Sequence, residues 1–258
     1  MASGKTIVLI TGASSGIGLE TVGLLAQASP DFQILLGSRS VEKGTKALES
    51  LRAAHGAALK SDISLLEIDV TDIKTITAAK EHIESTYGKL DVLINNAGII
   101  VTKPCDTLTN LRETFETNAF GPAVVTETLE PLLQKSTAGA RLIYVSSDQG
   151  SIANRLDPTY KWYKLRGDYY RMSKAAVNML SACHRVNYAE WGCKVCAFNP
   201  DFCLTNLTGE RGYEMRKQWG ARDPKDAAGA LVGLVLGKRD DDFTKSGIID
   251  IDGSLRPW

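Results

Sequence analysis

The stretch Thr11–Gly18 reads TGASSGIG and follows directly on the apolar run Thr6–Ile10. A strand, a glycine-rich turn and a helix start form the phosphate-binding unit of dinucleotide-binding folds. Gly12 permits the tight turn, Gly16 lets the backbone approach a pyrophosphate, and Gly18 lets the helix pack closely on the strand. The unpaired N–H groups at the helix start would face the phosphate. The loop therefore favours a dinucleotide site, although an ordinary turn with three glycines would look similar.

Short apolar runs alternate with longer segments of helical spacing along the rest of the chain. The other predicted strands are Phe32–Leu36, Leu65–Asp69, Val92–Asn95, Ala140–Val145, Lys194–Phe198 and Gly247–Ile251. The predicted helices are Ile17–Ala28, Val41–Ala54, Ile73–Tyr87, Leu108–Gln134 and Tyr169–Glu190. Continuous apolar strands are typical of a parallel sheet that is buried on both faces. The pattern predicts one α/β domain over 1–258, with a doubly wound parallel sheet of about seven strands. Pro122 and Pro131 should kink the helix over 108–134.

Composition and charge narrow the function classes. The 258 residues include 30 Lys and Arg against 30 Asp and Glu, so the formal net charge is zero and nucleic acid is not expected as the main partner. No run of apolar residues is long enough to predict a membrane-spanning helix, and the first residues lack a signal-peptide pattern. Five cysteines are an odd number, which favours a reducing compartment. We therefore expect a cytoplasmic protein.

Three further motifs follow the glycine loop in a fixed order. They are Asn95–Gly98 (NNAG), Ser147 at the end of a predicted strand, and Tyr170–Lys174 (YRMSK). With the glycine spacing TGxxxGxG, this order resembles the short-chain dehydrogenase/reductase family from Lys5 to about Gly253, and in particular its NADP-preferring carbonyl reductases. The resemblance implies a Rossmann-type domain that transfers a hydride between a nicotinamide and a carbonyl or alcohol carbon.

Tyr170 and Lys174 are four residues apart on a predicted helix and therefore share one face. A tyrosine has a pKa of about 10, and a neighbouring ammonium group would lower it toward neutral pH. A solvent-exposed pair on a helix surface would show the same spacing. The resemblance implies that Tyr170 is the general acid–base and that Lys174 also binds the nicotinamide ribose. Tyr169 is the competing tyrosine, but Ser173 stands four residues after it.

Two polar residues complete the expected catalytic set. Ser147 follows a buried-looking strand, and strand ends face the ligand crevice in such sheets. Its hydroxyl would hold the substrate carbonyl oxygen, although Ser146 competes for this position; the resemblance implies the second serine. Asn118 resembles the fourth catalytic residue of the family, where it would hold a water that relays protons to Lys174. An Asn satisfied by its own helix is the alternative.

Arg39 stands where NAD-selective sites usually carry a carboxylate, about 20 residues beyond the glycine loop. An arginine fork there matches a 2′-phosphate, whereas a carboxylate would repel it. The pair Ser38–Arg39 resembles NADP-preferring members, although Ser15 stands where many of them have a basic residue. A loop arginine in solvent is the alternative. NADP(H) is the expected cofactor.

The resemblance implies the remaining cofactor contacts as well. The full expected set is Gly12, Ser14, Ser15, Ile17, Gly18, Ser38, Arg39, Asp69, Val70, Asn96, Ala97, Gly98, Tyr170, Lys174 and Thr205. Asp69 would lie near the adenine amino group, and Thr205 would meet the nicotinamide carboxamide. No metal is expected. The CxxC of Cys193 and Cys196 lies on a predicted strand without a second pair, so we interpret it as structural.

The sequence departs from the family pattern in two places. Asp201 replaces a glycine that usually follows the sixth strand, although Asp tolerates left-handed backbone geometry better than most residues. The segment between Ser147 and Tyr170 is longer than is common in the family, which indicates an insert over roughly 151–169. This aromatic-rich insert would form a wall of the substrate mouth, or else a packed surface loop. The resemblance also implies that residues from roughly 203 to 220 form the substrate lid.

These features favour an NADPH-dependent carbonyl reductase that acts on a bulky ketone, such as a secondary metabolite. Two alternatives keep the fold: an NADPH-binding sensor or scaffold, and a pocket recruited for a non-redox step. The family's usual homo-oligomer, a dimer or tetramer, pairs the helices that here span about 108–134 and 169–190.

Overall fold

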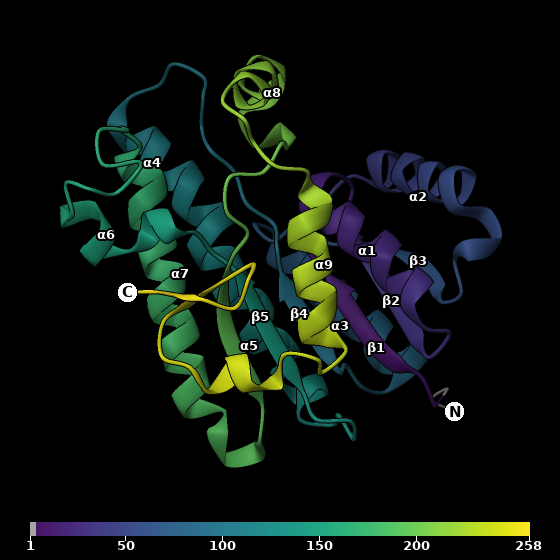
Figure 1. Cartoon of the computed structure of the whole chain (residues 1–258). Helices are drawn as coiled ribbons and strands as arrows, with labels where there is room; N and C mark the ends of the chain where they lie inside the picture. The colour runs from purple at the N-terminus through teal and green to yellow at the C-terminus, as the bar shows by residue number, and fades with distance from the viewer. Residues whose placement is uncertain (1–3) are drawn as a thin grey trace.

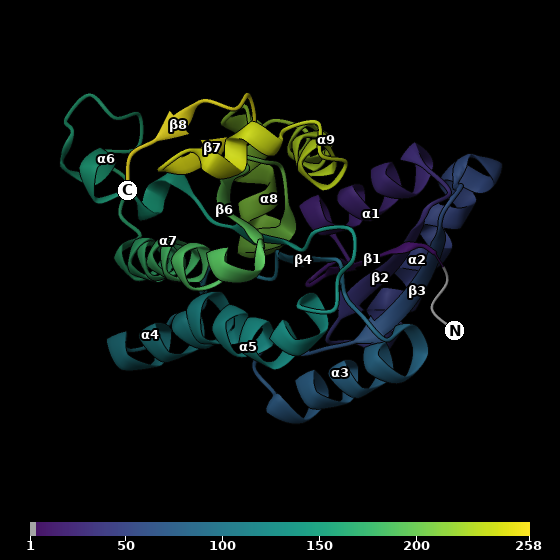
Figure 2. The ribbon, with the colours of Figure 1, turned by 90° about the horizontal axis from the view of Figure 1, so that it is seen from below.

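Eight strands form one sheet through the middle of the molecule, and helices cover both of its faces (Figures 1 and 2). The computed structural model describes residues 4–258, with no side chain described at 210 and 211. Residues 1–3 of the predicted domain lie outside the described part. The strands are β1 (Thr6–Ile10), β2 (Phe32–Ser38), β3 (Asp62–Glu67), β4 (Val92–Asn95), β5 (Arg141–Val145), β6 (Lys194–Asn199), β7 (Ile248–Asp250) and β8 (Leu255–Arg256). Their spatial order is β3-β2-β1-β4-β5-β6-β7-β8, and every neighbouring pair is parallel except β7 and β8.

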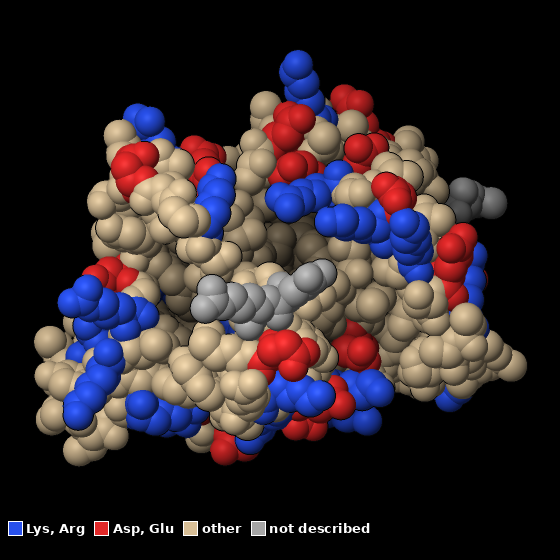
Figure 3. Space-filling model, turned by 90° about the horizontal axis from the view of Figure 1, so that it is seen from above, with Lys and Arg blue, Asp and Glu red and all other residues tan. Residues whose placement is uncertain are grey.

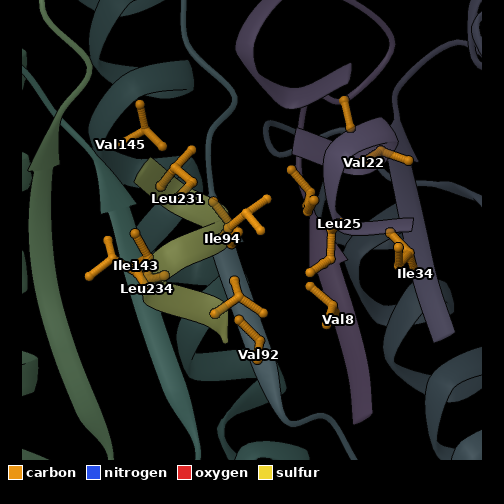
Figure 4. Close-up of a cluster of buried hydrophobic side chains, with 14 of the residues drawn as sticks. Val8, Val22, Leu25, Ile34, Val92, Ile94, Ile143, Val145, Leu231 and Leu234 are labelled. Atoms are coloured by element: carbon orange, nitrogen blue, oxygen red, sulfur yellow. The ribbon is translucent and has the colours of Figure 1, made fainter. Parts of the chain in front are cut away.

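Two layers of helices bury the two faces of this sheet. The helices are α1 (Gly16–Ala28), α2 (Val41–His55), α3 (Ile73–Tyr87), α4 (Thr107–Phe115), α5 (Gly121–Leu133), α6 (Ile152–Leu156), α7 (Asp168–Asn187), α8 (Gly209–Gln218) and α9 (Pro224–Val235). Seen from below, α3, α4 and α5 lie on one side of the sheet and α1 and α9 on the other (Figure 2). Leu25 of α1 and Leu231 of α9 pack against strand residues such as Val8 and Ile94 in one core cluster (Figure 4). A second cluster joins α3, α5 and α7 to the opposite face.

The predicted doubly wound α/β fold is confirmed, with differences at the sheet's edges. The sheet has eight strands rather than about seven, because the two-residue β8 folds back antiparallel on β7. Strand β3 starts at Asp62, earlier than predicted, because its polar first residues pair in register with β2 from Gln33 onward. The helix α9 was not predicted. Asp223 caps its N-terminus by accepting from the Lys225 N–H, and Pro224 is its first residue.

The helix predicted over 108–134 is interrupted in its middle. A π-helical turn at Glu116–Phe120 separates α4 from α5, and Pro122 lies in the first turn of α5. A proline has no N–H, so Pro122 removes the usual α-helical partner of the Asn118 carbonyl. Pro131 lies inside α5, close to its end at Leu133. The interruption thus falls at the residue predicted to be catalytic, in keeping with the frequent occurrence of π turns at functional sites.

The strand order reverses between β1 and β4, because β1 pairs with β2 on one side and with β4 on the other. In an open parallel sheet, such a switch point leaves a crevice beyond the carboxyl ends of the strands. The loops that follow β1, β2, β4, β5 and β6 all meet at this edge, beneath α8 in Figure 1.

Candidate active site

The glycine loop forms a close-packed turn between β1 and α1. Gly12 has a φ of +64°, and a Cβ at this position would lie 2.8 Å from the Cα of Ala97. A Cβ at Gly18 would lie 2.6 Å from the Asn96 amide nitrogen, so only glycine lets α1 approach the β4 loop this closely. Ser15 precedes α1 but makes no side-chain cap. The first N–H groups of α1 are therefore available to an anion in the crevice.

Asn96 and Thr11 join the β4 loop to the glycine loop. The Asn96 side chain donates to the Thr11 carbonyl (2.8 Å), and the Thr11 hydroxyl accepts from the backbone N–H groups of Asn96 (3.0 Å) and Ala97 (3.1 Å). These bonds hold the two loops in a fixed relation across the switch point. A rigid cradle of this kind suits the phosphates of a dinucleotide.

A cleft of about 720 Å³ runs along this edge of the sheet. It is lined by every residue of the expected cofactor set except Gly18, which packs behind it. Arg39 lines the cleft together with Lys43 and Lys46 of α2. Figure 3 looks down on this face and shows a hollow with Lys and Arg side chains gathered along one margin. The size and the lining of the cleft fit a dinucleotide with a negatively charged end.

Tyr170 and Lys174 lie on α7 at the inner end of the cleft. The Lys174 amine lies 5.8 Å from the centre of the Tyr170 ring and donates to the Val145 carbonyl at 2.8 Å. Lys174 is buried, and burial lowers its pKa to about 8. Burial also raises the pKa of Tyr170 to about 12, while Arg216 and a hydrogen bond with Ser147 act in the opposite direction. Lys174 is not among the groups that lower the pKa of Tyr170, so the lowering expected from their spacing is not found.

The two serines after β5 point to different places. The Ser146 hydroxyl donates to the Asn178 side chain on α7, at 2.5 Å. Ser147 instead faces the site, where its hydroxyl accepts from the Gln149 N–H at 3.1 Å and interacts with Tyr170. The alternation expected along a strand thus separates the pair. The competing Tyr169 is also set apart, because its hydroxyl lies 3.0 Å from the Thr107 hydroxyl on α4.

Asn118 is buried, with 1% of its surface exposed, and lies behind Lys174 and Gly98. Its side-chain oxygen accepts from the Ile99 N–H (2.8 Å), and its amide donates to the Ile99 carbonyl (2.9 Å) and the Ser173 hydroxyl (3.1 Å). Both amide hydrogens are therefore used within the protein. Asn118 joins the π turn to the β4 loop and to α7, and it does not line the cleft itself.

A second cavity of about 240 Å³ adjoins the cleft, and Tyr170 and Thr205 line both. The insert contributes Trp162 and Leu165 to its wall. Its other lining residues include Ser147, Phe202, Met215, Arg216 and Trp219. The insert thus lies against this cavity, and its role as a wall of the substrate mouth stays a prediction.

A model of the short chain dehydrogenase family matches residues 6–216 of this chain. The chain belongs to the short-chain dehydrogenase family. It is similar to the short-chain dehydrogenase anuI of Penicillium roqueforti, at 36% identity over 244 residues, or 88% of this chain and 94% of that protein. It is also similar to the short-chain dehydrogenase/reductase tropE of Talaromyces stipitatus, at 32% identity over 274 residues and 99% of each chain.

Among solved structures, the NADPH-bound carbonyl reductase from chicken fatty liver matches over 100% of both chains, with a TM-score of 0.77 and 26% identity. This short-chain dehydrogenase is therefore an oxidoreductase of a family that uses nicotinamide cofactors and acts on small molecules.

Asp201 has a φ of +57° and is the only non-glycine residue with a positive φ in the described part of this short-chain dehydrogenase. Asp201 thus adopts the left-handed geometry that glycine allows most readily. The Asp201 carboxylate pairs with Lys161 of the insert at 2.7 Å and lies 3.5 Å from the Arg222 guanidinium. Burial raises the pKa of Asp201, but the hydrogen bond and charge of Lys161, the backbone N–H of Phe202 and the charge of Arg222 together outweigh it and hold the pKa below its usual range. The two departures from the family pattern therefore contact each other.

Several residues of the site were missed by the sequence analysis. Lys43 and Lys46 are spaced like ordinary surface residues of α2, and only the fold brings them to Arg39. Arg171 follows Tyr170 and donates to the carbonyls of Trp162 (2.9 Å) and Leu165 (3.2 Å), which ties the insert to α7. No local signal pointed to these contacts, because the partners are distant in sequence or are backbone atoms.

The CxxC cysteines lie in the core, as expected. Cys193 and Cys196 are buried in the two hydrophobic clusters on opposite faces of the sheet. Burial raises the pKa of the Cys193 thiol to about 12. Within residues 4–258, no group of three or more His, Cys, Asp or Glu is placed to hold a metal ion. None of the helices in this range has the length and apolar character needed to cross a membrane.

Proposed function

We propose that this short-chain dehydrogenase is an NADPH-dependent carbonyl reductase. The observation that carries the proposal is the position of Tyr170, whose side chain lines both the large cleft and the adjoining cavity. A carbonyl group in the cavity would meet Tyr170 and Ser147 on one side and the nicotinamide end of the cleft on the other. When bound, the nicotinamide supplies the hydride that reduces the carbonyl carbon.

The protein's own groups handle the proton and the developing negative charge on the carbonyl oxygen. The pKa of Tyr170 lies above its usual range, at about 12, so the phenol stays protonated at neutral pH and can donate to that oxygen. Ser147 would donate a second hydrogen bond to the same oxygen. The charged form of Lys174, which predominates below its pKa of about 8, would stabilise the phenolate left behind and hold the nicotinamide ribose. Asn118 would fix the turn beside Lys174; because its amide hydrogens are already used, a relay water there would donate to an Asn118 oxygen.

Three cations support NADP rather than NAD. Arg39, Lys43 and Lys46 line one end of the cleft, and the carboxylate nearest in sequence, Glu42, is itself paired with Lys46 at 2.6 Å. A 2′-phosphate would find a charge-matched fork at Arg39. Arg39→Asp should therefore move the preference from NADPH toward NADH, measured as kcat/KM for each cofactor. A wild type that prefers NADH would contradict the assignment.

The reductase proposal is tested by a panel of ring-bearing and open-chain ketones, with NADPH oxidation followed at 340 nm. We expect ring-bearing ketones to be reduced best, because Trp162, Phe202 and Trp219 line the cavity; its volume of about 240 Å³ suits smaller compounds than the bulky secondary metabolites expected from the sequence. Tight NADPH binding without reduction of any ketone would instead support the sensor or scaffold alternative.

We also propose that the enzyme is a homo-oligomer, a dimer or tetramer. Apolar side chains are exposed on the outer faces of α5 and α7, where Val124 is 37%, Met179 66% and Val186 74% exposed. Phe120, just before α5, is 53% exposed. A second copy related by a two-fold axis would cover these side chains symmetrically.

A further inference from the structure

Arg216 of the lid helix α8 reaches into the second cavity and is held there firmly. Its Nη1 donates to the Cys203 carbonyl at 3.0 Å, and its Nε donates to the Thr208 hydroxyl at 3.2 Å. The guanidinium carbon lies 5.1 Å from the centre of the Phe202 ring. A guanidinium has five N–H donors, so these two bonds leave three for another partner.

The charge of Arg216 has no ion-pair partner among the residues that the structure describes. Two carboxylates also line the cavity, but Asp201 is paired with Lys161 and Arg222. Asp148 is buried, burial raises its pKa, and it forms no ion pair with Arg216 among the described residues. An arginine nevertheless stays charged when partly buried. A half-buried cation without a counter-charge is costly unless an anion joins it.

The cavity also indicates the shape of that anion. Trp162, Phe202 and Trp219 provide flat apolar walls, while Tyr170 and Ser147 stand where the carbonyl would be reduced. A volume of about 240 Å³ suits a single ring with small substituents and lies below that of most drug-sized sites. An aromatic ring could therefore span from the reducing end to the guanidinium.

We propose that Arg216 binds a carboxylate of the substrate, so that the enzyme selects aromatic ketones that carry an acid group. This inference rests on the proposed reductase function and names its substrate class. A carboxylate accepts two parallel bonds from a guanidinium, and the stacking on Phe202 holds the fork in place before the substrate arrives.

Two other roles of Arg216 predict different results. A guanidinium that only tethers α8 to the Cys203 loop would affect acidic and neutral ligands alike. The same is true if Arg216 acts only on the acidity of the Tyr170 phenol, since every ketone needs that proton. A preference for the acid over its ester therefore isolates a direct contact with the carboxylate.

The test uses 4-acetylbenzoate and its methyl ester, which differ only in the acid group. Each is titrated calorimetrically into the NADP⁺-loaded enzyme, in which the ketone cannot be reduced, and NADPH oxidation is measured separately. The variants are Arg216→Met, which keeps the length without the charge, and Arg216→Lys, which keeps the charge without the fork. Lys217→Met is the matched control, because Lys217 is exposed on the same helix and does not line the cavity.

We expect the wild type and Lys217→Met to bind the acid at least ten-fold more tightly than the ester. Arg216→Met should lose this preference, and Arg216→Lys should retain part of it. The inference is overturned if the wild type binds the two compounds with equal affinity or binds neither. It is also overturned if Arg216→Met still prefers the acid over the ester. Reduction of neutral ketones without preference for the acid would leave the reductase function standing while this inference falls. Arg216-dependent binding of the acid without reduction of any ketone would support the anion site and overturn the reductase.

Discussion

Replacing Lys174 by methionine should stabilise the cofactor-free protein while it abolishes turnover. The side chain is buried, and its pKa falls from 10.5 to about 8, which corresponds to about 3 kcal/mol at 1.36 kcal/mol per pKa unit. Below pH 8 the folded protein holds a buried ammonium group at that cost, and methionine of similar length removes it. The lost bond to the Val145 carbonyl offsets part of the gain, by about 1–3 kcal/mol at any pH.

The pH dependence separates these two effects. Because the folded-state pKa of Lys174 is lowered, the unfolded chain binds more protons between pH 8 and 10.5, and the wild type gains stability from this group as pH rises. The charge penalty that methionine removes should shrink from about 3 kcal/mol at pH 7 to about 1 kcal/mol at pH 10.

Urea unfolding followed by tryptophan fluorescence at both pH values measures this change. Lys217→Met, at an exposed position on α8, should differ from the wild type in its free energy of unfolding by the same small amount at both pH values. If the difference in unfolding free energy between Lys174→Met and the wild type does not change with pH, Lys174 is not the buried, weakened base described above.

Three further predictions concern other parts of the molecule. Asn118→Ala leaves the Ile99 N–H and carbonyl without their partner, so the free energy of unfolding should fall by about 1–3 kcal/mol. We expect kcat to fall as well; an unchanged kcat would show that the hydrogen bonds of Asn118 are not needed for turnover. Asp201→Gly keeps the left-handed backbone but loses the ion pair with Lys161, so KM for ketones should rise with little change in melting temperature. An unchanged KM would show that the ion pair between Asp201 and the insert does not contribute to substrate binding. Val186→Glu should dissociate the oligomer in light scattering, and a wild type that scatters as a 27.9 kDa monomer would contradict the proposed assembly.

The sequence predicted the parts of the structure that depend on local pattern. The continuous apolar strands and the glycine loop are encoded by neighbouring residues, and so is the pair Tyr170 and Lys174 on one helix face. The edges of the sheet were harder to predict from the sequence, because β8 consists of only two residues, both exposed, and β3 begins with polar residues. Strand pairing decides both, and it depends on residues far away in the chain.

The candidate site was predictable where a motif marks it and not elsewhere. The left-handed geometry at Asp201 could be expected from the glycine it replaces, but its ion pair with Lys161 spans 40 residues. Arg216 carries no sequence signal, since an arginine in a polar helix is usually a surface residue. The state of Lys174 was also missed, because its lowered pKa comes from burial in the folded protein rather than from spacing along the helix.

Tyr170→Phe tests whether Tyr170 donates the proton to the carbonyl oxygen during reduction. The change removes one hydroxyl, so folding and NADPH binding, measured by melting temperature and calorimetry, should survive. Tyr169→Phe is the matched control, since the Tyr169 hydroxyl lies beside Thr107 rather than in the cleft. With a ketone that the wild type reduces, kcat of Tyr170→Phe should fall about 10²- to 10⁴-fold while Tyr169→Phe stays near wild type. Wild-type turnover by Tyr170→Phe would show that Tyr170 does not donate the proton.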